Sequence, residues 1–420
     1  MGLHTVMQGD RLQIAILGKR NAGKSSLINA LTGQQTAIVS ETKGTTTDPV
    51  SKAMEILPLG PCMLIDTPGL DDEGELGEKR VERAKAVLHR TDIAVLVLDI
   101  AALQEESRGN LCLPELEQAV LDELQEKRTK GILVLNQSDR LPMEDGEAIR
   151  QAIQRKNSEI PVVLASAATG SGIEELKDVL VSLAPKEDPE LHIVSDLISE
   201  GDFIVLVVPV DSAAPKGRLI MPQQQTIRDI LDHHAMAILT QVSGLSETLS
   251  QLQGKVKMVI TDSQAFHEVD AIVPKDIPLT SFSILFARHK GNLSDLVSGV
   301  TAVDRLQDGD RILIAEGCTH RRQCEDIGTV KIPGWLREHS GKQLEITTCS
   351  GADFPSDLSS FAMVIHCGGC TLHEKEMKHR IYRAKEQGVP IVNYGIFIAY
   401  VNGILQRSVE LFPSIHAALL

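Results

Sequence analysis

The chain has 420 residues, of which 42% are hydrophobic and 24% charged, as expected for a soluble globular protein of two or three domains. No run of 18 or more apolar residues occurs, and the start lacks a basic region before an apolar core, so we expect neither a membrane span nor a secretory signal. The net charge of −15, without any block rich in lysine and arginine, argues against nucleic acid as a partner.

The first part of the chain alternates strand-like and helix-like segments, which is typical of a parallel sheet covered by helices on both faces. The expected strands are rich in valine, isoleucine and leucine and cover residues 12–18, 62–67, 93–100, 131–136 and 161–166. The expected helices begin at Lys24 or lie at residues 81–90, 113–127, 147–156 and 173–183. We therefore predict an α/β domain over residues 1–184.

Two smaller α/β domains are predicted after a polar segment with two prolines, residues 184–190, which we interpret as a linker. The first covers residues 190–273, with strands expected at 203–210 and 255–262 and helices at 221–238 and 246–254. Two further prolines in residues 273–281 indicate its end. The last domain covers residues 276–420, with strands expected at 310–317, 344–351, 361–369 and 389–395.

A phosphate-binding motif occupies residues 18–25, GKRNAGKS, between the first expected strand and the first expected helix. Gly18 and Gly23 allow a tight turn whose backbone N–H groups point at phosphates, and the helix N-terminus adds a favourable dipole. We expect Lys24 to reach the β- and γ-phosphates and Ser25 to hold Mg²⁺. The motif predicts a nucleoside triphosphate as ligand.

Four further motifs follow in the order expected for a guanine-nucleotide site. KGTTTD at 43–48 offers a threonine for Mg²⁺ and the γ-phosphate, and IDTPG at 65–69 offers a carboxylate near Mg²⁺ and a glycine N–H for the γ-phosphate. In NQSD at 136–139, Asp139 can accept both N1–H and N2–H of guanine, and SAA at 166–168 can present a backbone N–H to O6. The predicted nucleotide-binding residues are Gly18, Asn21, Ala22, Gly23, Lys24, Ser25, Ser26, Thr45, Thr46, Asp66, Gly69, Asn136, Asp139, Ser166 and Ala167.

These motifs resemble those of a Ras-like GTPase of the Era/TrmE type. GTTTD is similar to the GTTRD of that group, with Thr46 aligned to the switch-one threonine that binds Mg²⁺ and Thr45 as the runner-up. Asn21 is similar to the asparagine that ligates K⁺ in potassium-activated members, and Leu70 stands where Ras has a water-positioning glutamine. The resemblance implies hydrolysis of GTP to GDP with Mg²⁺ and K⁺, and catalytic roles for Lys24, Thr46 and Gly69.

One residue departs from the pattern of that group, because Gln137 replaces the lysine of the usual N-K-x-D sequence. The lysine packs along the base, so the resemblance implies weaker nucleotide binding here. Asp139 is present, and the preference for guanine is therefore expected to persist.

The cysteines suggest a second site. The chain has seven, an odd number without a signal peptide, which favours a reducing cytoplasm over a disulfide framework. CTH at 318–320 and HCGGC at 366–370 each follow an expected strand, and the carboxyl ends of parallel strands share one edge. Cys318, Cys367 and Cys370 are therefore expected to meet. A tetrahedral zinc site, an iron–sulfur cluster on three thiolates and a thioredoxin-like redox pair all fit this spacing.

The motif C-x-H is followed by 45 intervening residues and then by H-C-x-x-C, and both motifs come after an Era-like GTPase and a middle α/β unit. This order resembles the HydF family of [FeFe]-hydrogenase maturation GTPases over essentially the whole chain. The resemblance implies that Cys318, Cys367 and Cys370 hold a [4Fe-4S] cluster whose fourth iron position is exchangeable. His320 and His366 are motif members and candidate ligands. It also implies a homodimer through the middle domain, and a cytoplasmic scaffold that passes a transient diiron precursor to [FeFe]-hydrogenase, with radical-SAM maturases as further partners.

Two other functions fit the same motifs. An Era-like GTPase associated with the ribosome or tRNA would use the cysteines for a structural zinc ion, although the charge and the missing basic tail argue against it. A thiol–disulfide oxidoreductase would use Cys367 and Cys370 without any metal.

Overall fold

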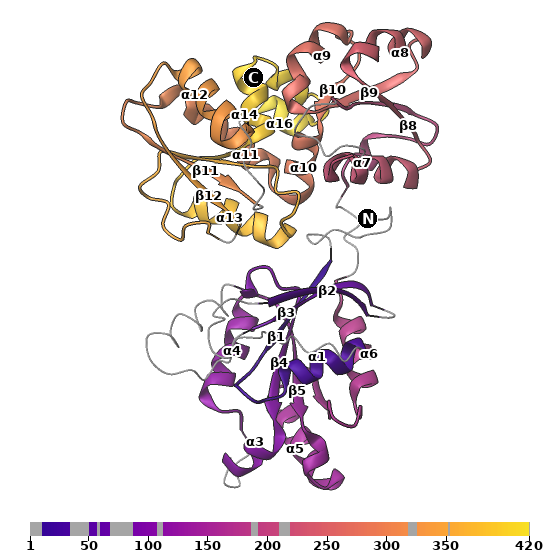
Figure 1. Ribbon diagram of the computed structural model, residues 1–420, viewed down its shortest axis with the longest axis vertical. Helices are drawn as coiled ribbons and strands as arrows, with labels where there is room; N and C mark the ends of the chain where they lie inside the picture. The colour runs from indigo at the N-terminus through magenta and orange to yellow at the C-terminus, as the bar shows by residue number, and fades with distance from the viewer. Residues whose placement is uncertain are drawn as a thin grey trace. The chain divides into compact units, whose positions relative to one another are not determined.

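The computed structural model divides the chain into two compact units, residues 1–187 and 188–420 (Figure 1). It describes residues 11–33, 50–56, 59–67, 87–106, 112–185, 192–209, 219–317, 326–351 and 353–419. Within those ranges no helix is long and apolar enough to cross a membrane. The division between the units falls inside the proline-containing segment 184–190.

The first unit is built on one six-stranded sheet with the strand order β2-β3-β1-β4-β5-β6. All neighbouring strands run parallel except β2, which is antiparallel to β3. The strands are β1 (Leu12–Leu17), β2 (Val50–Ile56), β3 (Gly60–Asp66), β4 (Ile93–Asp99), β5 (Lys130–Asn136) and β6 (Val162–Leu164). The α/β class predicted from the alternating pattern is therefore confirmed.

Helices cover both faces of this sheet, as Figure 1 shows. On one face α1 (Lys24–Thr32) and α6 (Ile173–Leu183) share a core with Val95 and Val97 of β4. On the other face α3 (Ile100–Glu106), α4 (Glu115–Glu126) and α5 (Met143–Lys156) share a core with Leu96 and Leu98. The alternation follows from the two-residue period of a strand. Each fully buried leucine or valine stabilises the unit by about 1.5–3 kcal/mol.

The second unit contains two four-stranded sheets whose strands are all parallel, in the orders β10-β9-β7-β8 and β12-β11-β13-β14. The first sheet consists of β7 (Phe203–Val207), β8 (Met236–Thr240), β9 (Val256–Thr261) and β10 (Leu279–Ser281). The second consists of β11 (Arg311–Glu316), β12 (Glu345–Ser350), β13 (Met363–His366) and β14 (Ile391–Asn393). β10 follows the predicted boundary at residues 273–276, yet it pairs with β9 in the first sheet.

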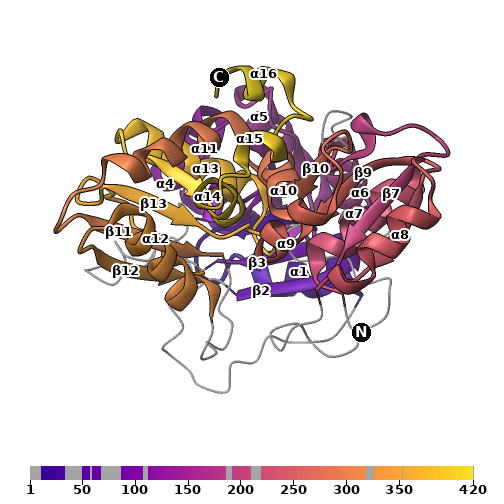
Figure 2. The same cartoon turned by 90° about the horizontal axis from the view of Figure 1, so that it is seen from above.

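Helices α10 and α14 lie between the two sheets of this unit, as Figures 1 and 2 agree. One hydrophobic core runs through both sheets, so the unit packs as a single body. Its helices are α7 (Met221–Asp232), α8 (Leu245–Gln251), α9 (Phe266–Ile272), α10 (Phe282–Lys290), α11 (Leu293–Val300), α12 (Ile332–Ser340), α13 (Glu374–Glu386), α14 (Tyr394–Val401), α15 (Leu405–Ser408) and α16 (Pro413–Ala417).

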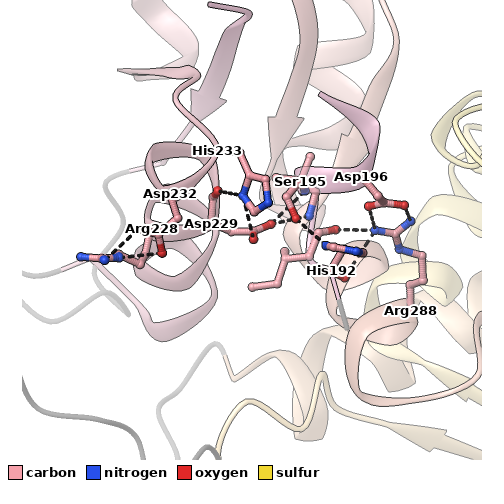
Figure 3. Close-up of polar contacts among 10 residues, drawn as sticks. His192, Ser195, Asp196, Arg228, Asp229, Asp232, His233 and Arg288 are labelled. Atoms are coloured by element: carbon pink, nitrogen blue, oxygen red, sulfur yellow. Dashed lines mark hydrogen bonds and ion pairs between the residues drawn. The ribbon is translucent and has the colours of Figure 1, made fainter. Parts of the chain in front are cut away.

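Polar contacts hold the start of the second unit in place (Figure 3). The Asp229 carboxylate on α7 accepts hydrogen bonds from the backbone N–H groups of Val194 and Ser195. Arg288 of α10 binds both carboxylate oxygens of Asp196, at 2.6 and 2.8 Å. Bidentate pairs of this kind fix direction as well as distance, so the chain enters the unit along a defined path.

Candidate functional site

An open cavity of about 650 Å³ lies at the edge of the first sheet where β1, β3 and β5 end. Residues from four of the predicted motifs line it, although they are up to 148 positions apart (Arg20 to Ala168). The lining consists of Arg20, Asn21, Gly23, Lys24, Ser25, Ser26, Asp66, Thr67, Asn136, Gln137, Asp139, Arg140, Ala167 and Ala168. The fold thus brings most of the predicted nucleotide-binding residues together at one edge.

Two glycines allow the loop between β1 and α1 to take its path. Gly18 has a φ of +144°, and a Cβ there would lie 2.3 Å from the carbonyl oxygen of Val97. Gly23 has a φ of +86°, and its Cβ would lie 2.3 Å from the side-chain nitrogen of Asn136. A side chain at either position would clash with a neighbouring strand end, so the tight loop depends on glycine.

Lys24 begins α1, and its ammonium group lies within the loop. It donates hydrogen bonds to the backbone carbonyls of Gly18 and Lys19, each at 2.8 Å. The positive charge is thereby held beside the backbone N–H groups at the start of the helix, where the helix dipole also favours an anion. This arrangement suits phosphate groups.

Ser25 and Asp66 come from different motifs and meet in the cavity. The Ser25 hydroxyl donates to Oδ2 of Asp66 at 3.3 Å, and Oδ1 of Asp66 is buried without a hydrogen-bond partner among the described residues. Burial raises the pKa of Asp66, while Lys24 and the Ser25 hydroxyl oppose that shift. A hydroxyl beside a carboxylate with an unsatisfied oxygen is a donor set that Mg²⁺ prefers, so the residues present fit that ion.

Asn136 ties the phosphate loop to the loop after β6. Asn136 is only 1% exposed. Its side-chain nitrogen donates a hydrogen bond to the Ala22 carbonyl at 2.9 Å, and its side-chain oxygen accepts one from the Ala167 N–H at 3.2 Å. Asp139 lies beside these loops, and one of its carboxylate oxygens accepts a hydrogen bond from Ser166 at 2.5 Å. The carboxylate is thus fixed at the rim of the cavity, where guanine can donate to it.

Gln137 and Arg140 have a role in the cavity that sequence reasoning missed. The Gln137 amide donates to the Asn21 carbonyl at 3.1 Å, so it still braces the phosphate loop although it lacks a charge. Arg140 donates to the Gln137 side-chain oxygen at 2.9 Å and to Asp99 at 3.0 Å, and Arg140 is one of the residues that line the cavity. Gln137 thus keeps a contact with the phosphate loop, and Arg140 brings a positive charge to the cavity wall. The only signal in the sequence is an arginine directly after NQSD.

We expect the substitution Arg140→Ala to weaken binding of GDP about two- to fivefold. This is the range for loss of one exposed cation–π interaction, here proposed between Arg140 and the guanine ring. Inosine diphosphate should lose the same factor, because the proposed contact is with the ring and not with the exocyclic amine. Displacement of a fluorescent nucleotide measures both. Arg155→Ala, an exposed arginine of α5, is the matched control. An unchanged affinity in Arg140→Ala would contradict this role.

Several predicted site residues lie outside the described residues: Thr45, Thr46 and Gly69 of the nucleotide site, and Cys318 and His320 of the thiol site. Their predicted roles stay predictions. Asn21 lines the cavity, and its role as a K⁺ ligand also stays a prediction.

Cys367 and Cys370 lie just beyond β13 at the carboxyl edge of the last sheet. The Cys367 sulfur accepts hydrogen bonds from the backbone N–H groups of Gly317, at 3.0 Å, and Gly369, at 3.4 Å. The Thr371 hydroxyl also donates to the Gly317 carbonyl at 3.3 Å. Gly317 immediately precedes Cys318 in the chain, so the end of β11 is joined to the segment carrying the other two cysteines.

His366 is fully buried, and both of its ring nitrogens have partners. Nδ1 lies 2.7 Å from the Cys367 carbonyl, and Nε2 lies 3.1 Å from the Arg380 guanidinium. Burial, followed by the Arg380 charge, lowers the pKa of His366 to about 4, so the ring is neutral. In this arrangement neither nitrogen is available to a metal, although the sequence made His366 a candidate ligand.

Within the described residues, which leave out Cys318 and His320, no group of three or more histidine, cysteine, aspartate or glutamate side chains is arranged to hold a metal ion. The predicted metal centre therefore rests on two described thiols and their backbone donors.

Fold and cavity define the first unit as a Ras-like P-loop GTPase domain, and a family model described as a 50S ribosome-binding GTPase matches residues 13–137. Two further models match the second unit: the Hydrogen maturase F dimerization domain at residues 193–291 and the Hydrogen maturase F tetramerization domain at residues 294–411. The chain belongs to the hydrogen maturase F family, HydF. The family predicted from the CTH and HCGGC motifs is confirmed.

Individual GTPases also match part of this chain. GTPase Der of Kosmotoga olearia is 35% identical over 226 residues, covering 51% of this chain and 48% of that protein. The tRNA modification GTPase MnmE of Alkaliphilus metalliredigens is 34% identical over 176 residues, covering 42% and 35%. The chain thus spans about half the length, or less, of these relatives. The crystal structure of Era with MgGDPNP and a segment of 16S ribosomal RNA is 20% identical with a TM-score of 0.36, covering 58% of this chain and 98% of that one.

Proposed function

We propose that this protein is a GTP-hydrolysing scaffold and carrier that binds a [4Fe-4S] cluster, assembles the diiron subcluster precursor and transfers it to [FeFe]-hydrogenase. The observation that carries the proposal is the combination, in one chain, of a nucleotide cavity with two hydrogen maturase F domains, the second of which contains the HCGGC segment. The proposed place of action is the cytoplasm, where thiols remain reduced.

For GTP hydrolysis, Lys24 binds the β- and γ-phosphates. Asp139 selects guanine, with a backbone N–H of residues 166–168 directed at O6. Ser25 and Asp66 would hold Mg²⁺, with Thr46 completing the site, and Mg²⁺ would neutralise charge on the phosphates. The proposal gives Gly69 the γ-phosphate contact and Asn21 a K⁺ ion that replaces a water-positioning side chain. Hydrolysis acts as a switch for contact with partner maturases.

For the cluster, Cys318, Cys367 and Cys370 are the proposed ligands. Cys367 supports this assignment because its sulfur accepts hydrogen bonds from two backbone N–H groups. Such hydrogen bonds stabilise a thiolate and its bonds to iron. His366 is proposed as a support for the backbone of Cys367, and His320 remains a candidate ligand. Three fixed thiolates would keep the cluster in place while an exchangeable fourth position accepts and releases a metal fragment.

For assembly, we propose a homodimer through the first sheet of the second unit. Its edge strand β8 and the end of α7 expose three large apolar side chains, Leu231 at 54%, Met236 at 39% and Leu239 at 46%. An exposed apolar edge strand is a ready partner for a second copy. The proposed partners beyond this are [FeFe]-hydrogenase and radical-SAM maturases.

The test is purification without oxygen, followed by iron, sulfide and zinc analysis and an EPR spectrum after reduction. We expect about four irons and four sulfides per chain, lost in Cys318→Ser, Cys367→Ser and Cys370→Ser. Cys112→Ser, at an exposed cysteine of the GTPase domain, is the control and should retain the iron. About one zinc and no sulfide would instead favour a GTPase with a structural metal.

A further inference from the structure

Two fully buried cations hold the thiol segment, and neither belongs to a predicted motif. Lys290 ends α10 and Arg380 lies on α13, and each is only 2% exposed. Lysine and arginine are almost never buried to this degree unless they are paired. Both reach the same seven residues, 366–372, from different helices.

Arg380 fixes the tautomer of His366. A guanidinium only donates hydrogen bonds, so Nε2 of His366 must accept, and Nδ1–H therefore donates to the Cys367 carbonyl. The guanidinium also donates hydrogen bonds to Glu376 at 2.9 Å and to the Gly351 carbonyl at 2.6 Å. It lies over the Phe354 ring, 4.9 Å from the ring centroid. Arg380 thus positions the backbone of Cys367 through His366.

Lys290 holds the other end of the segment. Its ammonium donates to the carbonyls of Cys370, at 3.4 Å, and Leu372, at 3.3 Å. The cation therefore lies against the backbone of the second cysteine, and it comes from the helix that packs between the two sheets of this unit.

The positive charges of Lys290 and Arg380 can stabilise negative charge at this edge of the sheet, which packing contacts alone do not do. The buried carboxylate of Glu316 ends β11, the strand paired with β13, so it lies at the same edge of the sheet as the thiols. Metal binding requires deprotonated thiols, and in a region of low dielectric constant nearby cations stabilise their negative charge. One-electron reduction adds one more negative charge, so the same cations favour the reduced state.

We propose that Lys290 and Arg380 are positioning residues that hold the Cys367–Cys370 segment in its binding conformation and raise the reduction potential of the cluster bound there. This inference rests on the proposed iron–sulfur function. Two residues outside the cysteine motif would thus control the redox state of the cluster.

The experiment uses the full chain purified without oxygen, with the midpoint potential measured by an EPR-monitored titration and the fold checked by circular dichroism. Arg380→Gln and Lys290→Met remove the charges while keeping much of the side-chain length, and Arg380→Lys and Lys290→Arg keep them. Lys378→Gln removes a charge from the exposed face of α13, where Lys378 pairs with Glu374, and serves as the control.

We expect a more negative midpoint potential in Arg380→Gln and Lys290→Met, and values near the parent protein in the charge-keeping variants and in Lys378→Gln. An unchanged potential in the iron-loaded Lys290→Met variant overturns the inference, even if Arg380→Gln fails to fold. An equal shift in Lys378→Gln overturns it as well, because the effect would then be non-specific. Absence of iron from the parent protein would instead overturn the proposed function, and the inference with it.

Discussion

The substitution Lys24→Ala is expected to lower the rate of GTP hydrolysis about 100- to 1,000-fold, the range for removing one group that stabilises charge in a transition state. The ammonium of Lys24 lies in the phosphate loop against the carbonyls of Gly18 and Lys19, and in the proposed mechanism its charge faces the transferred phosphoryl group. Release of phosphate under saturating GTP measures the effect.

The matched control is Lys19→Ala, in the same loop. The Lys19 ammonium lies 3.4 Å from Glu117 and does not line the nucleotide cavity, so we expect hydrolysis to change little. The Lys24→Ala protein should also keep its full iron content, because the thiols belong to the other compact unit. A folded but iron-free Lys24→Ala protein would contradict the separation of the two sites.

The substitution Asp139→Asn is expected to weaken GDP binding by at least about 100-fold, since two hydrogen bonds to a charged acceptor are lost. The amide offers one acceptor and one donor, which suits xanthine better than guanine, so xanthosine diphosphate should bind more tightly than in the parent protein. The Ser166 hydroxyl can still donate to the amide oxygen, and the loop after β6 should therefore persist.

Competition of GDP and xanthosine diphosphate against a fluorescent nucleotide measures this change in preference. Asp145→Asn, at an exposed acidic residue in the first turn of α5, is the control and should leave the preference unchanged. If Asp139→Asn bound both nucleotides as the parent protein does, Asp139 would not be the residue that selects guanine.

Local motifs made the nucleotide site predictable from the sequence. The phosphate loop depends on glycines at fixed spacing between a strand and a helix. IDTPG, NQSD and SAA each lie at the end of a parallel strand of the same sheet, namely β3, β5 and β6. Because the carboxyl ends of parallel strands share an edge, Lys24, Asp66 and Asp139 had to meet once the strands were recognised.

Contacts between distant segments could not be predicted in this way. Lys290 and Arg380 reach the thiol segment from helices whose packing no spacing reveals, and Arg380 looks in the sequence like any polar residue of an amphipathic helix. The orientation of His366 was missed for a related reason. The spacing places it beside Cys367, but it ends β13 with its ring against Arg380, so its nitrogens are already engaged.

The side-chain amide of Asn136 affects the entropy cost of nucleotide binding. Its two hydrogen bonds join the phosphate loop to the loop after β6, and the Gln137 amide adds a second link to the phosphate loop. These hydrogen bonds join the loops that follow three strands, β1, β5 and β6. Protein–protein hydrogen bonds of this kind restrict the loops themselves, which lowers the conformational entropy cost of ordering them around a nucleotide.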